Sequence, residues 1–261
     1  MTDSIKQKFD LTGKVAVITG SSKGIGAAIA RGLAEYGAKV VVSSRKQEAV
    51  DAVAEQMRAD GLEAHAVACH VGDPDRLQNL VDKTVEKYGG IDILINNAAT
   101  NPVFEPLAKN DAGVFDKIMN VNLKACFLLA NLCYPIMEKR GGGSVINIAS
   151  VEGMTPSTNL GLYSVSKAAL IMLTKSQGKE WGRVGIRSNA ICPGLIKTKF
   201  SSALWQNEGI MEVVTKHLPA GRAAAPEEMA GLAVFLASEA ASYCTGQVFT
   251  ADGGHTVAGG F

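Results

Sequence analysis

The chain of 261 residues contains 26 Lys and Arg against 25 Asp and Glu, and 47% of its residues are hydrophobic. This length suits one large α/β domain with a sizeable core, the balanced charge gives no indication of nucleic acid as a partner, and no apolar run is long enough to span a membrane. The five cysteines and four histidines have neither CxxC nor metal-ligand spacing, so we expect reduced thiols, no metal and a cytoplasmic protein.

Short apolar runs alternate with longer amphipathic stretches along the whole chain. The apolar runs predict strands at 14–19, 39–43, 63–69, 92–96, 144–148, 186–191 and 247–250. The amphipathic stretches predict helices near 24–36, 46–60, 74–88, 111–138, 161–182 and 226–237. Because most strands are apolar on both faces, we predict an α/β fold with a doubly wound (Rossmann-type) parallel sheet and helices on both faces. We expect one domain over 1–261.

The stretch 195–219 follows Pro193-Gly194 and mixes polar with bulky apolar residues. In open α/β sheets, ligands bind beyond the carboxyl ends of the strands. We therefore predict that 195–219 is a lid over a bound substrate. A plain pair of surface helices is the alternative.

A glycine-rich run, Thr19-Gly20-Ser21-Ser22-Lys23-Gly24-Ile25-Gly26, links the first predicted strand to the first helix. Glycines there permit a tight turn, and the helix N-terminus presents N–H groups to a pyrophosphate. The spacing is not the general GxGxxG. The position of the run in the first βαβ unit is what indicates a dinucleotide.

The residues after the second predicted strand bear on the choice between NAD and NADP. An NAD site places Asp or Glu there to bind the ribose 2′-hydroxyl. Here the segment reads Ser43-Ser44-Arg45-Lys46, with no acid before Glu48. Arg45 and Lys23 can instead bind a 2′-phosphate. We predict NADP(H) over NAD(H), the alternative being that both cations are only solvated.

Tyr163 and Lys167 are four residues apart on a predicted helix, with Ser150 upstream. Residues at this spacing share a helix face. A positive charge beside a phenol lowers its pKa, which predicts that Tyr163 exchanges protons near neutral pH. By itself such a pair is equally typical of a helix surface.

These segments together resemble the short-chain dehydrogenase/reductase family over nearly the whole chain. The motifs are Thr19-Gly20-x-x-x-Gly24-Ile25-Gly26, Asn96-Asn97-Ala98-Ala99, Val121-Asn122, Ser150, Tyr163-x-x-x-Lys167 and Pro193-Gly194. The resemblance implies that Tyr163 is the general acid or base and that Lys167 lowers its pKa. It also implies that Ser150 hydrogen-bonds the substrate carbonyl and that Asn122 holds a relay water. Donors aimed at a developing alkoxide lower the barrier to hydride transfer.

The resemblance also implies a set of cofactor contacts, with two departures from the family pattern. His70 stands where the family usually has Asp, and Ala99 where it usually has Gly. The implied cofactor-binding residues are Gly20, Ser22, Lys23, Gly24, Ile25, Gly26, Ser44, Arg45, Lys46, His70, Val71, Asn97, Ala98, Ala99, Tyr163, Lys167, Pro193, Gly194, Ile196 and Thr198.

Several segments more closely resemble the NADPH-dependent carbonyl reductases of the dehydrogenase/reductase member 4 type. Among them are Ser43-Ser44-Arg45-Lys46 and Pro193-Gly194-Leu195-Ile196-Lys197-Thr198. We predict NADP(H)-dependent reduction of a hydrophobic ketone or aldehyde, reversible to oxidation of a secondary alcohol. The expected substrate residues are Ser150, Val151, Leu160, Tyr163, Leu195, Phe200, Leu204 and Trp205.

Two other functions remain open. A 3-oxoacyl-carrier-protein reductase would share every motif and needs a basic surface, for which Lys139, Arg140 and Lys179 are candidates. A non-catalytic dinucleotide sensor would have no chemical need for the four catalytic positions together. The resemblance further implies a homotetramer in which the helices of 111–138 and 161–182 pair across a two-fold axis, although core packing alone would explain their apolar residues.

Overall fold

A computed structural model describes residues 4–258 of the chain. Residues 1–3 and 259–261 lie outside the described residues. None of the helices formed by residues 4–258 has the length and apolar character needed to cross a lipid bilayer.

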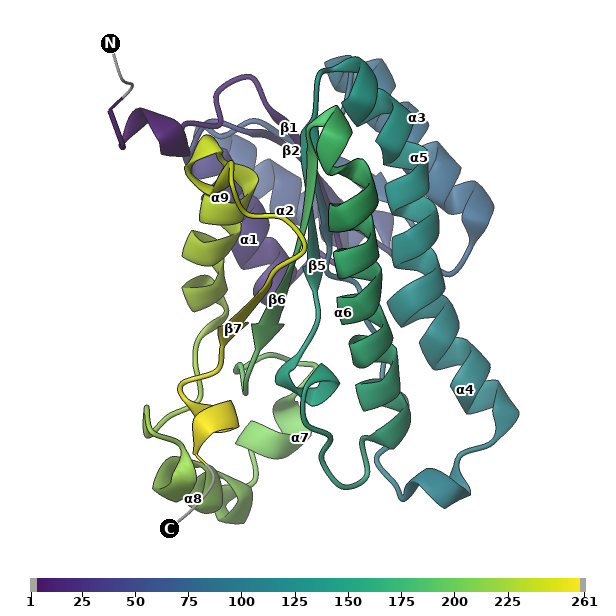
Figure 1. Cartoon of the computed structure of the whole chain (residues 1–261), viewed down its shortest axis with the longest axis vertical. Coiled ribbons are helices and arrows are strands. Elements are labelled where there is room, and N and C mark those ends of the chain that lie inside the picture. The colour runs from purple at the N-terminus through teal and green to yellow at the C-terminus, as the bar shows by residue number, and fades with distance from the viewer. Residues whose placement is uncertain (1–3, 259–261) are drawn as a thin grey trace.

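A seven-stranded, entirely parallel sheet forms the centre of the molecule, in the order β3-β2-β1-β4-β5-β6-β7 (Figure 1). Each predicted strand is confirmed within a few residues. The strands are β1 Val15–Thr19, β2 Lys39–Ser44, β3 Ala64–Ala68, β4 Ile93–Asn96, β5 Gly143–Ile148, β6 Ile186–Pro193 and β7 Val248–Ala251.

Helices cover both faces of this sheet, as predicted. On one face lie α1 Gly24–Glu35, α2 Gln47–Ala59 and α9 Ala230–Ala237. The other face carries α3 Pro74–Tyr88, α4 Ala112–Met119, α5 Ala125–Lys139 and α6 Gly161–Trp181. Two shorter helices, α7 Ser202–Trp205 and α8 Glu208–His217, lie in the 195–219 segment at the lower end of Figure 1.

Alternating side chains of the buried strands build a core on each side of the sheet. Ile18 and Val42 pack with α1, α2 and α9, whereas Val17 and Val41 pack with α3 and α5. All four of these side chains are fully buried. Burying one such side chain stabilises the fold by about 1.5–3 kcal/mol, so the two cores hold the sheet rigid beneath the loops at its edge.

The predicted helix over 111–138 is interrupted. Between α4 and α5 the backbone forms a π-helical turn, η3 Asn120–Lys124, in which the Ala125 N–H donates to the Asn120 carbonyl. A π turn accommodates one extra residue in the helix and is frequent at functional sites. Here it contains Asn122.

The strand order reverses between β1 and β4. The chain runs outward through β2 and β3, then returns to place β4 on the other side of β1. The loops after β1 and β4 diverge at such a reversal, which opens a crevice at the carboxyl ends of the strands. The glycine-rich run follows β1 and Asn97 follows β4, so both lie at this crevice.

Candidate active site

Close packing between the glycine-rich run and the end of β4 forms one wall of the crevice. The Thr19 hydroxyl accepts hydrogen bonds from the N–H groups of Asn97 (3.0 Å) and Ala98 (3.1 Å). The Asn97 side-chain nitrogen donates to the carbonyls of Thr19 (2.9 Å) and Gly20 (3.1 Å). A Cβ atom on Gly20, whose φ is +65°, would lie 2.9 Å from the Ala98 Cα, and one on Gly26 would overlap the Asn97 side chain. Only glycine fits at these two positions.

The open N-terminus of α1 is suited to bind a dinucleotide diphosphate. Its N-cap residue is Lys23, and no side chain caps the first turn. The first N–H groups of a helix have no partner within the helix and attract phosphate oxygens. Thr198 also reaches this turn, since a Cβ on Gly24 would lie 3.3 Å from its methyl group. The cradle therefore fits the diphosphate of a nicotinamide cofactor.

Exposed basic side chains surround the end of β2 where it meets this cradle. Arg45 and Lys46 directly follow the strand, and Lys23 lies at the start of α1. Within residues 4–258 no ion-pair partner approaches any of the three. His70, after β3, is exposed, and its Nδ1 accepts from the Gly72 N–H at 3.2 Å. No carboxylate follows β2 at the position typical of NAD sites.

Tyr163 and Lys167 lie on one face of α6, as their spacing predicts. The Lys167 ammonium lies 5.6 Å from the centre of the Tyr163 ring and donates to the Ile148 carbonyl at 2.7 Å. Only 2% of the Lys167 side chain is exposed. Burial away from water disfavours its charge and lowers the pKa of Lys167 to about 8.

The expected lowering of the Tyr163 pKa by this cation is wrong for the structure in hand. Burial raises the pKa of Tyr163 above its ordinary value, and a hydrogen bond with Ser150 opposes this only partly. The Lys167 ammonium lies over the Tyr163 ring and donates its hydrogen bond to the Ile148 carbonyl, so burial of the phenol sets the direction of the shift. The phenol therefore stays protonated near neutral pH in this structure.

Asn122 is fully buried, and all of its side-chain hydrogen-bonding groups are occupied. Its Oδ1 accepts from the Thr100 N–H at 2.8 Å, while its Nδ2 donates at 3.0 Å to both the Thr100 carbonyl and the Ser166 hydroxyl. A relay water at Asn122 would have to bind the main-chain carbonyl, which has two lone pairs. Cys126 Sγ already contacts that carbonyl at 3.5 Å.

Ser166 is a residue of the site to which the sequence analysis assigned no role. It accepts from Asn122 and donates to the Tyr163 carbonyl at 2.7 Å, so it joins the π turn to the turn of α6 that carries Tyr163. Ser166 is fully buried. The available signal was its place in Tyr163-Ser164-Val165-Ser166-Lys167, where a buried polar side chain needs a partner.

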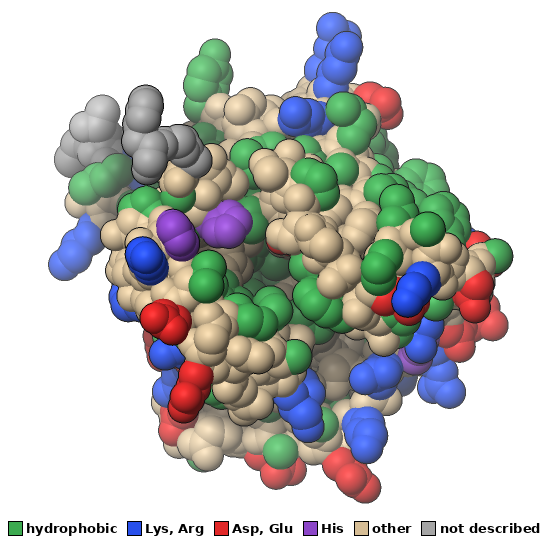
Figure 2. All heavy atoms as spheres, turned by 90° about the horizontal axis from the view of Figure 1, so that it is seen from below, with side chains coloured by type: hydrophobic (Ala, Val, Ile, Leu, Met, Phe, Trp, Pro, Cys, Tyr) green, Lys and Arg blue, Asp and Glu red, His purple; other side chains and the backbone are tan. Residues whose placement is uncertain are grey.

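The predicted substrate residues are only partly brought together. The Phe200 ring centre lies 6.0 Å from that of Tyr163, and Val151 and Leu160 flank the loop between Ser150 and α6. Trp205 instead donates its indole N–H to the Thr198 carbonyl at 2.8 Å, within the 195–219 segment. Figure 2 shows hydrophobic side chains around a central hollow at this end of the molecule.

The 195–219 segment is anchored at its base. Ala224 donates to the Leu195 carbonyl at 3.0 Å and accepts from the Lys197 N–H at 2.9 Å, so Ile196 is held and buried. Gly194 donates to the Ala251 carbonyl at 3.1 Å, directly after Pro193 at the end of β6.

One wall of the crevice was not anticipated. Leu107, from the loop after β4, packs on the start of α6, since a Cβ on Gly161 would lie 3.0 Å from its side chain. Leu107 remains 56% exposed, although it packs against Gly161, two residues before Tyr163 in the chain. An exposed leucine at a site mouth is available to contact an apolar ligand.

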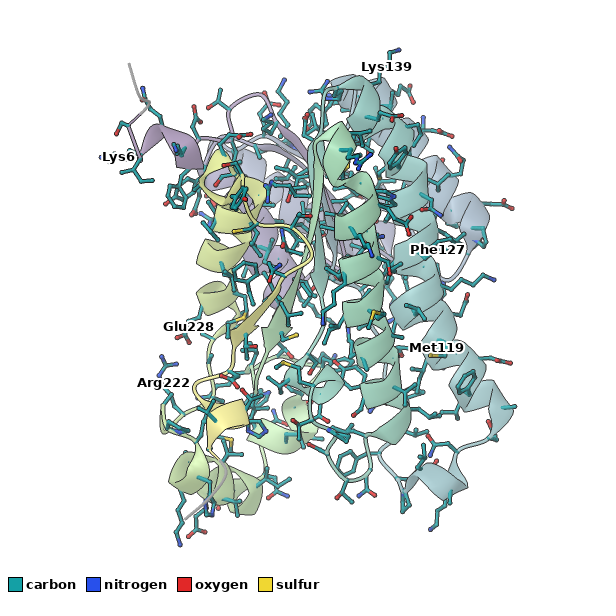
Figure 3. The ribbon with its side chains drawn as sticks, in the orientation of Figure 1. Lys6, Met119, Phe127, Lys139, Arg222 and Glu228 are labelled. Carbon is teal, nitrogen blue, oxygen red and sulfur yellow. The ribbon has the colours of Figure 1, made fainter. Side chains whose placement is uncertain are left out.

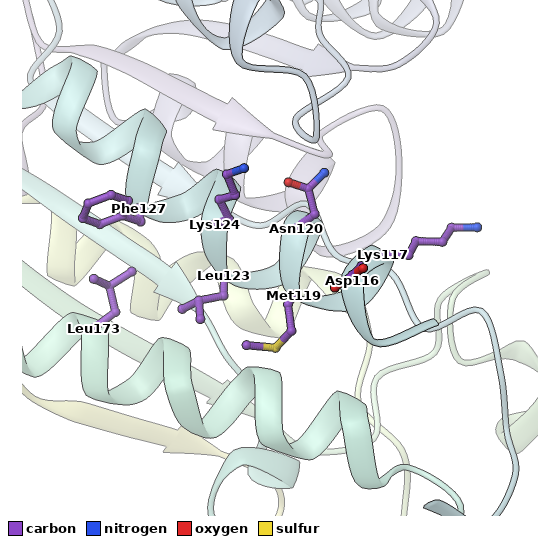
Figure 4. A pocket seen from close by; sticks show the side chains of 8 residues that line it. All are labelled: Asp116, Lys117, Met119, Asn120, Leu123, Lys124, Phe127 and Leu173. Atoms are coloured by element: carbon purple, nitrogen blue, oxygen red, sulfur yellow. The ribbon is translucent and has the colours of Figure 1, made fainter. Parts of the chain in front are cut away.

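A second concavity lies on the helical side of the molecule, away from the ends of the strands. It is a groove of about 730 Å³ over α4, η3, α5 and α6 (Figure 4). Two residues of this groove, Met119 and Phe127, are labelled in Figure 3, where they lie along the side of the helix layer. Its lining residues are Asp116, Lys117, Met119, Asn120, Leu123, Lys124, Phe127 and Leu173.

Comparison with known proteins identifies the family. A family model described as enoyl-(acyl carrier protein) reductase matches residues 20–256. The dehydrogenase/reductase SDR family member 4 of Oryctolagus cuniculus is 45% identical over 253 residues, covering 97% of each chain. That of Sus scrofa is 46% identical over 250 residues, covering 96% of this chain and 90% of its own. The chain belongs to the short-chain dehydrogenase/reductase family.

Solved structures of this family share the whole fold. A gluconate 5-dehydrogenase from Burkholderia cenocepacia, in complex with NADP and tartrate, has a TM-score of 0.92 at 36% identity and covers 96% of this chain and 98% of its own. A 7α-hydroxysteroid dehydrogenase, complexed with NADH and 7-oxo glycochenodeoxycholic acid, has a TM-score of 0.92 at 34% identity and covers 97% of this chain and 98% of its own. The chain is thus a short-chain oxidoreductase of a family that binds nicotinamide dinucleotides.

Proposed function

We propose that this short-chain dehydrogenase/reductase is an NADP(H)-dependent carbonyl reductase that acts on ketones or aldehydes and, in reverse, on secondary alcohols. The observation that carries the proposal is the meeting of Tyr163, Lys167 and Ser150 beside a dinucleotide cradle. The member 4 relatives, 45% and 46% identical over 97% and 96% of this chain, support the same class.

The proton chemistry follows from the side chains present. NADPH held by the glycine-rich run and the basic side chains after β2 would supply a hydride to the carbonyl carbon. Ser150 and Tyr163 donate hydrogen bonds to the carbonyl oxygen, and Tyr163 passes its proton to the alkoxide that develops. A water bound to the Asn122 carbonyl then returns a proton to the Tyr163 phenolate. The 195–219 segment acts as the substrate lid, with Phe200 next to Tyr163.

The preference for NADP(H) rests on charge at the end of β2. Three basic residues lie near the end of β2, namely Lys23, Arg45 and Lys46, and no acidic residue stands at the position typical of NAD sites. A guanidinium such as that of Arg45 binds a phosphate with paired hydrogen bonds. We expect Arg45→Asp to raise the KM for NADPH by more than tenfold while changing the KM for NADH much less. An unchanged ratio of the two KM values would contradict this placement of the phosphate.

The experiment that tests the activity is initial-rate oxidation of NADPH and NADH with a panel of carbonyl compounds. The panel spans alkyl and aryl ketones, dicarbonyls, retinal, sugars, steroids and a 3-oxoacyl thioester. NADPH-linked turnover of hydrophobic ketones or dicarbonyls is the expected result. A protein that binds NADPH tightly but turns over no member of the panel would instead be a dinucleotide sensor.

A second candidate function is reduction of 3-oxoacyl thioesters on a carrier protein. The observation in its favour is the family model, whose description names an acyl-carrier-protein reductase. A kcat/KM on the thioester far above that on free ketones would transfer the function to this candidate. This candidate needs a basic surface for the carrier protein. Arg140 forms an ion pair with Asp92 at 2.8 Å, so Lys139 and Lys179 are the other two candidates for that surface.

The proposed enzyme acts as a homotetramer in the cytoplasm. Apolar side chains remain exposed along α5 and α6, with Phe127 at 45%, Val165 at 48% and Met172 at 60%. Phe127 lines the groove of Figure 4, which a second copy of the chain would cover. Side chains of this kind gathered on one face are typical of a protein interface.

A further inference from the structure

Glu152 lies within the candidate site, yet no motif of the family assigns it a role. Its backbone N–H donates to the Ser150 hydroxyl at 3.2 Å. Its carboxylate accepts from the Ser157 N–H (2.8 Å), the Ser157 hydroxyl (2.6 Å) and the Ser164 hydroxyl (3.1 Å). One residue thus contacts the turn with Ser150, the loop after it and the first turn of α6.

Every partner of this carboxylate is a donor without a positive charge. Within residues 4–258 no Lys, Arg or His forms an ion pair with Glu152. A carboxylate that only accepts hydrogen bonds is in the form expected of the ionised group. Ser164, which follows Tyr163 in the chain, is 5% exposed, and the Glu152 charge acts on the Tyr163 phenol.

We propose that Glu152 is a positioning residue that fixes the Ser150 turn and the Tyr163 turn relative to one another, and that its charge sets the pH range in which Tyr163 exchanges its proton. This proposal rests on the proposed function. The electrostatic part agrees with the direction of the Tyr163 pKa, which the Glu152 charge raises.

Glu152 supplies the negative charge near Tyr163, because the other described groups around Tyr163 are neutral or positive near pH 7. Cys192, from β6, is a thiol whose pKa burial raises to about 11, so it is neutral near pH 7. Phe200, from the lid, has no charge. The groups that face Tyr163 from the elements packed around it are Ser150, Glu152, Lys167, Cys192 and Phe200.

The test compares the pH profiles of kcat/KM for alcohol oxidation in the wild-type protein and in Glu152→Gln. Glutamine keeps the size of the side chain and one acceptor but removes the charge. In alcohol oxidation, kcat/KM rises with pH as the catalytic base loses its proton. We expect Glu152→Gln to move this rise to lower pH by about half a unit to one unit, the effect of one charge several ångströms away at a partly exposed site. The direction does not depend on whether Tyr163 or Lys167 titrates, because removing a negative charge eases proton loss from either group.

Two further variants separate the charge from the hydrogen bonds. Ser157→Ala keeps the charge but loses one partner, so its pH profile should stay that of the wild-type protein. Glu152→Ala loses all side-chain contacts and should lower both kcat and the melting temperature more than Glu152→Gln does. A Glu152→Gln profile that coincides with that of the wild-type protein would overturn the proposal. Wild-type protein without any carbonyl reductase activity would instead reject the proposed function.

Discussion

At the scale of single residues, Lys167 brings a charge into the interior of the candidate site. Its pKa is about 8, against an ordinary value of 10.5. Below pH 8 both the folded and the unfolded states bind the proton, and the folded state bears the cost of burying the charge. Between pH 8 and 10.5 the unfolded state binds more protons, so this group makes stability rise with pH. A charge kept at such a cost is consistent with a functional role.

Replacing Lys167 with Met should remove this pH dependence. As pH rises from 8 toward 10, the free energy of unfolding of the wild-type protein should increase relative to that of Lys167→Met. The change should be at most about 1.4 kcal/mol per pH unit. Urea unfolding at several pH values measures both curves. Parallel curves would show that Lys167 titrates normally in the folded protein.

Tyr163→Phe tests the proton donor itself. Loss of the hydroxyl should reduce kcat by at least about a thousandfold, since this hydroxyl is the proposed source of the proton. The melting temperature and the binding of NADPH should change little, because the ring keeps its contact with Phe200. Substantial residual turnover would reject the assigned mechanism, provided that circular dichroism shows a folded variant.

At the scale of elements, the long helix α6 contains a glycine in its interior that helix propensity alone does not favour. A Cβ on Gly178 would lie 2.7 Å from the Gly246 Cα and 2.9 Å from the Thr245 hydroxyl, so the helix packs directly on the loop before β7. Gly231, in α9, has no atom within 4 Å of the same position and is exposed. The two glycines differ only in what surrounds them.

Alanine at these two positions should therefore have opposite effects. Gly178→Ala should destabilise the protein by about 1–3 kcal/mol, because the loop must move. Gly231→Ala should stabilise it by up to about 1 kcal/mol, because alanine is the better helix former. Chemical denaturation of both variants gives the comparison, and a stabilised Gly178→Ala would contradict the packing of α6 on the loop.

At the scale of the whole molecule, the groove over α4, α5 and α6 and the site at the ends of the strands lie on different surfaces. The groove faces sideways from the helix layer, whereas the site opens at the lower end of Figure 1. Assembly through the groove would leave the mouth of the site open to substrate. It would also hold α5 and α6, which carry the π turn and Tyr163, in one geometry.

Phe127→Glu should weaken the proposed assembly. A carboxylate on the groove would lose its hydration if a second copy covered it, so sedimentation should show a shift from tetramer toward smaller species. Val213→Glu serves as a control, because Val213 is 59% exposed on α8, outside the groove. A wild-type monomer at working concentration would contradict the homotetramer.

The sequence by itself determined the strands, the helices and the motifs that define the family, because these depend on local periodicity and spacing. The placement of Lys167 one turn after Tyr163 is of this kind. Only the tertiary structure decided the direction of the Tyr163 pKa, since burial raises it and Phe200, distant in sequence, lies against the ring. The tertiary structure also decided that Gly178 packs directly on Gly246 and that the Asn122 side chain hydrogen-bonds Thr100 and Ser166. Desolvation and close contact arise from residues that the fold brings together, and one-dimensional patterns carry no record of them.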